Sequence, residues 1–214
     1  MKRNLIFIRH GKLDLPYASH DVMPIAVLND LATKKLDPAS DNDFFKANIA
    51  YFESLIKKFN ITTVYCSPSQ RCVSLENYLR PILRNRMIPV FFLNELNEIY
   101  FDLDVLFASV NKITLSEVNY RLFNALLNND DGVESIGDVL KRIDLIFQKM
   151  PNSENILILT HGFLMRVIVA HHQYCVAEAK KQFILNDILA IPRFNYFDGF
   201  IINSNNKIKF ISPE

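Results

Sequence analysis

The sequence has little net charge, few cysteines and no long hydrophobic run at its start, and each of these absences excludes a class of protein. A formal net charge of +1 over 214 residues predicts no general attraction to nucleic acid or anionic surfaces, so any anion site must be local. The first apolar run covers only residues 5–8, which is too short for the core of a signal peptide or for a membrane-spanning helix. We therefore expect a cytoplasmic protein that binds neither nucleic acid nor membranes.

The cysteine and histidine patterns do not indicate a metal site. The three cysteines, Cys66, Cys72 and Cys175, are odd in number and lack the spacing of metal ligands, so we expect reduced and mostly buried thiols. His171 and His172 are neighbours on a predicted helix and point in different directions, with no carboxylate or thiol at ligand spacing around them. The sequence thus predicts no bound metal ion.

Hydrophobic residues, by contrast, are abundant. They make up half of the chain, and 17 of them are phenylalanine, which suits one large domain spanning residues 1–214. Short apolar stretches alternate with segments whose apolar residues recur every three or four positions, the pattern of an α/β fold. The predicted strands are 5–8, 62–66, 90–93 and 155–159, and the predicted helices are about 43–58, 69–85, 115–127, 135–149 and 162–172.

The end of the chain changes to a series of predicted strands. Residues 188–191, 195–202 and 207–211 are apolar stretches that we interpret as closing strands of the sheet. The polar segment 203–206 predicts a turn that makes the last two of them a hairpin.

Two histidines stand where predicted parallel strands end. His10 follows the first predicted strand, and His161 follows the fourth. The segment Ser-Pro-Ser-Gln-Arg at 67–71 follows the second strand and places Arg71 on the first turn of a helix. The carboxyl ends of parallel strands meet at one edge of a sheet, where ligands usually bind. Together with Arg9 and Arg71, the two histidines are therefore candidates for one phosphate-sized pocket.

These residue types suit the binding and transfer of a phosphoryl group. Planar guanidinium groups such as those of Arg9 and Arg71 match phosphate oxygens in bidentate geometry. Nearby cations also disfavour a charged imidazole, which keeps a histidine neutral, with one ring nitrogen as a nucleophile. A carboxyl group near a bound phosphate has its pKa raised by like-charge repulsion, so it can protonate a leaving oxygen. Glu95 and Glu98 are the two candidates for that carboxyl group.

The motifs resemble those of the histidine phosphatase superfamily, in its phosphoglycerate mutase-like branch. The pattern of that family is Arg-His-Gly, then Ser-Pro-x-x-Arg, then Leu-x-Glu-Ile-x-Phe-Gly, and finally His-Gly. This sequence has the corresponding segments in the same order, at residues 9–11, 67–71, 96–102 and 161–162. A further segment, 132–139 with Arg142, resembles the Gly-Glu-Ser helix start of the family.

The resemblance implies a three-layer α/β/α sandwich with a mostly parallel central sheet, and it implies roles for the matched residues. His10 is the nucleophile that forms a phosphohistidine, and His161 donates to the transferring phosphoryl group. Arg9, Arg71 and His161 bind that group. No metal ion or other cofactor is then required. The partner is a small phosphorylated metabolite, and a homodimer is left open.

The matched segments also separate catalytic from structural side chains. Glu98 is favoured over Glu95 as the general acid, because only Glu98 is followed by Ile-x-Phe as in the family. Ser67 is expected to be structural, as a helix N-cap or turn residue. Ser135 is expected to cap a helix that has the acidic charge of Glu134 at its positive end.

The sequence departs from the family in the loop after the first histidine. Lys12, Leu13 and Pro16 stand where the family often has Glu or Gln, then Ser or Thr, then Asn. The Ser-x-Trp-Asn motif of the mutases is missing, and the chain has no tryptophan. We therefore predict a metal-independent phosphomonoesterase for small phosphate esters, similar to α-ribazole or sugar-phosphate phosphatases. The alternatives are phosphoryl transfer of the phosphoglycerate mutase type, and a non-catalytic member that binds a phosphorylated ligand.

Substrate choice is expected to depend on two loop or cap segments over the strand ends, at about 12–42 and 99–134. Their periodicity is weak over much of their length, and the first contains three prolines. Residues that flank the predicted site in sequence are candidate substrate contacts, although ordinary exposed loop residues are an equally good interpretation. These candidates are Lys12, Tyr17, His20 and Tyr100.

Overall fold

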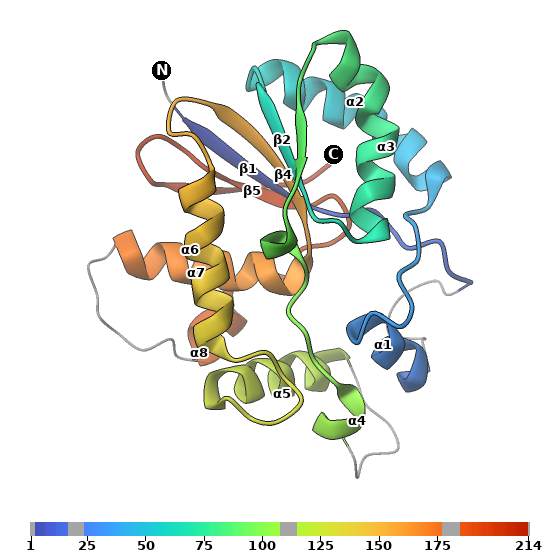
Figure 1. The fold of residues 1–214 in the computed structure, drawn as a ribbon, viewed down its shortest axis with the longest axis vertical. Helices are drawn as coiled ribbons and strands as arrows, with labels where there is room; N and C mark the ends of the chain where they lie inside the picture. Colours follow the sequence, from blue (N-terminus) through green and yellow to red (C-terminus); the bar gives the residue numbers. More distant parts are fainter. Residues whose placement is uncertain (1–2, 17–23, 108–114, 177–184, 214) are drawn as a thin grey trace.

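The computed structural model describes residues 3–16, 24–107, 115–176 and 185–213, and its centre is a six-stranded sheet in the order β3-β2-β4-β1-β5-β6 (Figure 1). Neighbouring strands from β3 to β1 run parallel, whereas β5 is antiparallel to both β1 and β6. The predicted mostly parallel sheet is thus confirmed. The strands are β1 (Asn4–Arg9), β2 (Thr63–Cys66), β3 (Val90–Phe92), β4 (Asn155–Thr160), β5 (Gly199–Ile202) and β6 (Ile208–Ile211).

Helices cover both faces of the sheet, with α2 and α3 on one side and α6 and α7 on the other (Figure 1). The three layers agree with the fold that the sequence predicted. The helices are α1 (Ile25–Ala32), α2 (Asn42–Lys58), α3 (Gln70–Asn85), α4 (Leu103–Leu106), α5 (Leu115–Asn128), α6 (Ile136–Lys149), α7 (Gly162–Val176) and α8 (Leu185–Ala190), with a short 3-10 helix η2 (Asn94–Leu96).

Strand β1 shows how the sequence produces this layering. Successive side chains of a strand point to opposite faces of the sheet. Leu5 and Phe7 pack in the cluster that contains α6 and α7, and Ile6 and Ile8 pack in the cluster that contains α2 and α3. Because both faces are covered, the strand is an unbroken apolar run rather than an alternating one.

The helix starts follow local capping chemistry. Ser135 accepts a hydrogen bond from the backbone N–H of Asp138 at the start of α6, as predicted. Asp41 caps α2 in the same way, by accepting from the backbone N–H groups of Asp43 and Phe44. The N-cap position of α3 is occupied by Ser69, not by Ser67.

One predicted strand is a helix. Residues 188–191 were expected to be a closing strand, but Ile188 and its neighbours belong to α8, and only the hairpin of β5 and β6 closes the sheet. A four-residue apolar run does not distinguish a buried strand from a short buried helix. Ile188 is fully buried where α8 packs against α5 and α7, so its apolar character reflects burial and not a strand.

Helices α1, α4 and α5 form a separate group at one end of the molecule, below the sheet in Figure 1. Their apolar side chains make a hydrophobic cluster of their own around Phe101, Leu103 and Leu122. Leu28 of α1 packs against this cluster and against Leu13, in the loop that follows β1. This group is called the cap below, and it corresponds to the segments predicted to lie over the strand ends.

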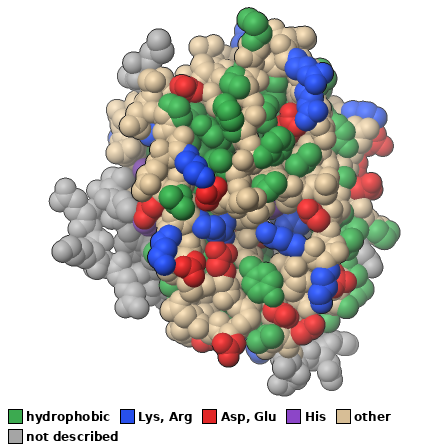
Figure 2. Space-filling view, viewed as in Figure 1, with side chains coloured by type: hydrophobic (Ala, Val, Ile, Leu, Met, Phe, Trp, Pro, Cys, Tyr) green, Lys and Arg blue, Asp and Glu red, His purple; other side chains and the backbone are tan. Residues whose placement is uncertain are grey.

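Strand β3 is an edge of the sheet. Phe91 and Phe92 are 49% and 48% exposed, and hydrophobic side chains gather in the upper part of the view in Figure 2, where Figure 1 places β3.

Among the helices of the described segments, none combines the length and the apolar character needed to cross a bilayer.

A substitution at Gly199 can test the packing of β5 on β1. A Cβ at Gly199 would overlap the carbonyl oxygen of Phe7 in β1, which is backbone and cannot rotate away. We expect Gly199→Ala to lower the free energy of unfolding by about 3 kcal/mol or more, measured by urea denaturation. Gly137→Ala is the matched control, because its Cβ would meet only the Ser135 hydroxyl at 3.8 Å. Equal stability of the two variants would contradict this account.

Candidate active site

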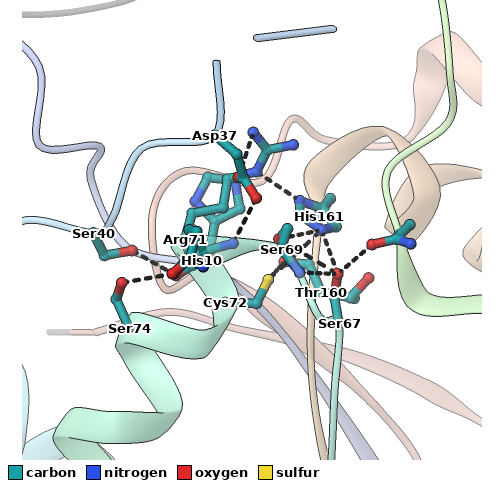
Figure 3. Close-up of polar contacts among 12 residues, drawn as sticks. His10, Asp37, Ser40, Ser67, Ser69, Arg71, Cys72, Ser74, Thr160 and His161 are labelled. Atoms are coloured by element: carbon teal, nitrogen blue, oxygen red, sulfur yellow. Dashed lines mark hydrogen bonds and ion pairs between the residues drawn. The ribbon is translucent and has the colours of Figure 1, made fainter. Parts of the chain in front are cut away.

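Three parallel strands deliver the predicted site residues to one edge of the sheet. His10 follows β1, Ser67 follows β2 and His161 follows β4, and backbone bonds tie these ends together. The N–H of His10 donates to the Thr160 carbonyl at 3.0 Å, and the N–H of Ser67 donates to the Leu159 carbonyl at 3.0 Å. Figure 3 shows the resulting cluster of His10, Arg71 and His161.

The ring of His10 is held in one tautomer. Its Nδ1 lies 2.8 Å from the carbonyl oxygen of Gly11, and because a carbonyl only accepts, Nδ1 must carry the proton. The lone pair is then on Nε2, the nitrogen that a nucleophilic histidine would use. There is no room for a side chain at Gly11, because a Cβ there would lie 2.9 Å from the ring of Phe197. His10 itself is 4% exposed and lines a cavity.

Arg9 supplies buried positive charge beside this histidine. Its Nη1 donates to the carbonyl oxygen of Phe194 at 2.6 Å, and its guanidinium carbon lies 4.5 Å from the centre of the Tyr196 ring. Burial lowers the pKa of Arg9 from its ordinary value, but an arginine so placed still carries its charge at neutral pH. The segment after α8 therefore anchors the arginine, a contribution that the sequence did not reveal.

Arg71 lies between two acceptors, one neutral and one charged (Figure 3). Its Nε donates to Nδ1 of His161 at 3.0 Å, and its Nη1 is 3.8 Å from a carboxylate oxygen of Asp37. The other oxygen of Asp37 accepts from the backbone N–H of Gln70 at 2.7 Å. Asp37 was not predicted, since a single aspartate in a segment of weak periodicity gives no signal.

His161 takes part in a chain of hydrogen bonds whose direction can be assigned. Because Nδ1 accepts from Arg71, the proton of a neutral His161 is on Nε2, which lies 3.0 Å from the Ser67 hydroxyl. That hydroxyl donates in turn to Asn97 Oδ1 at 2.9 Å. Ser67 is thus structural, as expected, but it orients a histidine and does not cap a helix.

The neutral form of His161 follows from its surroundings. Burial and the charge of Arg71 lower the pKa of His161 well below its ordinary value. The side chain is fully buried, and its neighbour Gly162 lines the cavity whereas His161 does not. The resemblance implied that His161 donates to a phosphoryl group; here both ring nitrogens face groups of the protein.

The carboxylate of Glu98 lies at the N-terminus of α7. Its two carboxylate oxygens accept from the backbone N–H groups of Phe163 and Leu164, at 3.1 and 2.8 Å, and from its neighbour Ile99 at 3.0 Å. Burial raises the pKa of Glu98, while these hydrogen bonds and the charge of Arg71 act in the opposite direction. The carboxyl group of Glu98 lines the same cavity as His10. The Glu98 side chain therefore both caps the N-terminus of α7 and faces the candidate site.

Glu95, the other candidate for the general acid, does not line the cavity. It pairs with Lys149 at 2.6 Å, and this hydrogen bond lowers the pKa of Glu95. Arg142 holds the segment between these glutamates by donating to the carbonyls of Glu95 and Asn97, both at 2.8 Å. Arg142 also forms a bidentate pair with Glu134, at 2.7 Å for each bond, so the Gly-Glu-Ser segment positions Glu98 indirectly.

The cavity joins the sheet edge to the cap and has a volume of about 170 Å³. The residues from the sheet edge that line it are Arg9, His10, Arg71 and Glu98, and most of the remaining lining residues are apolar. In the part of the chain that is described, no group of three histidine, cysteine or acidic side chains could hold a metal ion. Cys66 and Cys72 are buried and form no disulfide within the described residues, as expected.

Two of the candidate substrate contacts, Lys12 and Tyr100, are not brought to this cavity. Lys12 lies 4.0 Å from Asp41, and Tyr100 is 42% exposed; neither lines the cavity, whereas their neighbours Leu13 and Phe101 do. Leu13 and Phe101 form isolated β-bridges, and adjacent side chains of an extended chain point in opposite directions. The other two candidates, Tyr17 and His20, lie outside the described residues.

A family model for the histidine phosphatase superfamily, branch 1, matches residues 46–200. The chain belongs to this superfamily. The match includes Arg71, Glu98 and His161 and begins after Arg9 and His10. No curated protein matches the sequence.

Solved structures of other superfamily proteins share the fold at low sequence identity. A mycobacterial glucosyl-3-phosphoglycerate phosphatase is 14% identical with a TM-score of 0.60, covering 98% of this chain and 97% of its own. An α-ribazole phosphatase from Shigella flexneri is 16% identical with a TM-score of 0.58, covering 93% and 89%. A phosphoglycerate mutase from Bacillus anthracis is 16% identical with a TM-score of 0.58, covering 99% and 92%.

The lowered pKa of His161 predicts a loss of stability in acid. Below pH 6.5 the unfolded chain binds a proton at this histidine and the folded chain does not, so acidification favours unfolding by up to about 1.4 kcal/mol per pH unit. We expect the free energy of unfolding to fall less steeply between pH 7.5 and pH 5 in His161→Gln. Glu98 and His172 also titrate abnormally, but they are present in both proteins and cancel in the comparison. Identical slopes in urea denaturation would refute the assignment.

Proposed function

We propose that the protein is a metal-independent phosphomonoesterase that acts through a phosphohistidine at His10. The observation that carries the proposal is the shared cavity: His10, with its lone pair on Nε2, lines it together with Arg9, Arg71 and the carboxyl group of Glu98 at the sheet edge. A phosphate monoester bears about two negative charges near neutral pH, which Arg9 and Arg71 would neutralise. The guanidinium groups thus supply the positive charge that the transfer requires.

In the first step, Nε2 of His10 forms a bond to phosphorus as the bond from phosphorus to the leaving oxygen breaks. Protonated Glu98 gives its proton to that oxygen, so the alcohol leaves in neutral form. In the second step, a water molecule attacks the phosphohistidine and Glu98 takes its proton. The bond between nitrogen and phosphorus then breaks, and inorganic phosphate is released with His10 and Glu98 restored.

His161 is proposed to position Arg71 in this mechanism. Its Nδ1 accepts from Nε of Arg71 at 3.0 Å, which leaves the two terminal nitrogens of the guanidinium for other partners. Direct donation to a phosphoryl oxygen would require a proton on Nδ1 and a displaced Arg71. The hydrogen bond to Ser67 supports the first arrangement, because it keeps the proton on Nε2.

Phosphoryl transfer of the mutase type is the alternative, since the superfamily includes mutases. A mutase returns the phosphoryl group to an acceptor hydroxyl, so it needs polar groups around that acceptor. In this chain Leu13 lines the cavity within the loop where the mutases have Ser-x-Trp-Asn. This favours water as the acceptor.

The nucleophile can be tested with p-nitrophenyl phosphate in the presence of a metal chelator. We expect the native protein to release phosphate and His10→Ala to fall to background, because no other histidine lines the cavity among the described residues. Brief reaction with radiolabelled substrate should trap an acid-labile, alkali-stable phosphoryl group on the native protein alone. His172→Ala is the matched control and should retain activity, since His172 bonds to the Asn206 carbonyl and does not line the cavity. Turnover that the chelator abolishes would contradict the proposal.

The general acid can be tested by varying the leaving group. A p-nitrophenolate leaves without protonation, whereas an alkoxide does not, so Glu98→Gln should lose about 10²- to 10⁴-fold in kcat/KM with alkyl phosphates and far less with p-nitrophenyl phosphate. Glu95→Gln should change neither, because Glu95 pairs with Lys149 and does not line the cavity. Equal losses of Glu98→Gln on both substrates would assign Glu98 a purely structural role at the start of α7.

A further inference from the structure

Most of the cavity wall beyond the phosphoryl site is apolar, and its polar residues are Asn119, Arg166 and Arg193. Three cap elements contribute to it: α1, the segment leading into α4, and α5. The loop after β1, the start of α7 and the segment after α8 complete the wall. The apolar lining residues are Leu13, Leu28, Leu31, Ala32, Phe101, Leu103, Val118, Phe163 and Phe194.

These side chains belong to packed hydrophobic clusters. Phe101, Leu103 and Val118 are at most 6% exposed and pack together, with Leu28, Ala32 and Phe163 against them. Leu13 and Leu31 form a second cluster that Leu28 also joins. The wall is therefore a continuous extension of the cap core, and a ligand that covers it removes apolar surface from water.

The hydrogen-bonding groups of Arg166, the buried arginine of this wall, are largely satisfied by the protein. Arg166 is 4% exposed; its Nη1 donates to Asn119 Oδ1 at 3.1 Å, and its Nη2 donates to the carbonyls of Ile188 and Leu189 at 2.8 and 3.2 Å. Its guanidinium also lies 4.7 Å from the ring centre of Phe123. Among the polar atoms of Arg166, only Nε has no partner. A polyhydroxylated ligand would thus find few hydrogen-bond partners on Arg166, and exposed Arg193 is the other charged residue of this wall.

An unmatched hydroxyl group in such a place is costly. A buried hydroxyl without a partner weakens binding by about 5- to 150-fold, whereas each buried methylene strengthens it about fourfold. The balance between these two effects favours an apolar ligand in the cap portion of the cavity. The volume of about 170 Å³ favours a small one.

We infer that the substrate is a phosphomonoester whose leaving group is a small apolar alcohol or phenol, not a sugar or another polyol. The inference rests on the proposed phosphatase function and names its substrate class. The phosphoryl group would lie against Arg9, His10 and Arg71, and the leaving group would cover the apolar wall of the cap.

A series of n-alkyl phosphates from ethyl to hexyl tests this inference. Intrinsic reactivity is nearly constant along the series, so kcat/KM reports the contacts of the chain. We expect kcat/KM to rise about fourfold for each added methylene until the cavity is filled. Glucose 6-phosphate and glycerol 1-phosphate should react at least about 100-fold more slowly than hexyl phosphate, because their hydroxyls stay unpaired.

Two leucine variants locate the effect. Leu28→Asn puts an amide into the wall and should flatten the dependence on chain length, since half-buried Leu28 lines the cavity. Leu145→Asn is the matched control, because Leu145 lies on α6, is 42% exposed and does not line the cavity. The control should keep the native dependence, and a control that flattened like Leu28→Asn would overturn the inference.

The other outcomes separate this inference from the proposed function. Rapid hydrolysis of sugar phosphates with no dependence on alkyl chain length would overturn the inference and leave the phosphatase function standing. A preference for glucose 1,6-bisphosphate over hexyl phosphate would also overturn it, in favour of a second anion near Arg166. No hydrolysis of any ester, p-nitrophenyl phosphate included, would overturn the proposed function on which the inference rests.

Discussion

Positive charge buried at the carboxyl edge of the sheet is the constraint on which the site depends. Guanidinium groups leave water at a large cost in free energy, and the chain offsets this cost for Arg9 and Arg71 chiefly with neutral acceptors. The carbonyl of Phe194 holds one arginine and Nδ1 of His161 holds the other, while the carboxylate of Asp37 stays 3.8 Å away. Full neutralisation by acidic partners would remove the attraction for an anion. The arrangement instead leaves a positive potential inside the cavity, which a phosphate group matches.

The same charge sets the protonation of the neighbouring groups. His161 must be neutral to accept from Arg71, and the cations around it favour that form. Glu98 is under opposed influences: burial favours its protonated form, and the backbone N–H groups of α7 favour the carboxylate. A group held in such a balance can give up a proton and recover it within one reaction cycle. In the proposed mechanism, the N-terminus of α7 thus contributes to the chemistry as well as to the fold.

The parts of the molecule that follow local rules could be predicted from the sequence. Buried parallel strands are apolar runs, and their ends share an edge, so His10 and Arg71 could be brought together without coordinates. Residues 188–191 could not be assigned, because their burial against other helices, rather than their periodicity, determines their conformation. Asp37 and Leu28 come from a segment of weak periodicity whose position depends on tertiary packing. The cap portion of the cavity is therefore visible only in the structure.

Strand β1 pairs with β4 on one side and with β5 on the other, so the earliest strand in the chain finds its neighbours about 150 and 195 positions later. At the usual speed of translation, that strand waits roughly ten to thirty seconds or more before its partners exist. Such non-local pairing slows folding, and an apolar strand left unpaired on the ribosome is prone to aggregate. Chaperone binding during synthesis would protect β1 through this interval. The long-range pairing that brings Arg9 to the carbonyl of Phe194 thus makes folding during synthesis a demanding step for this chain.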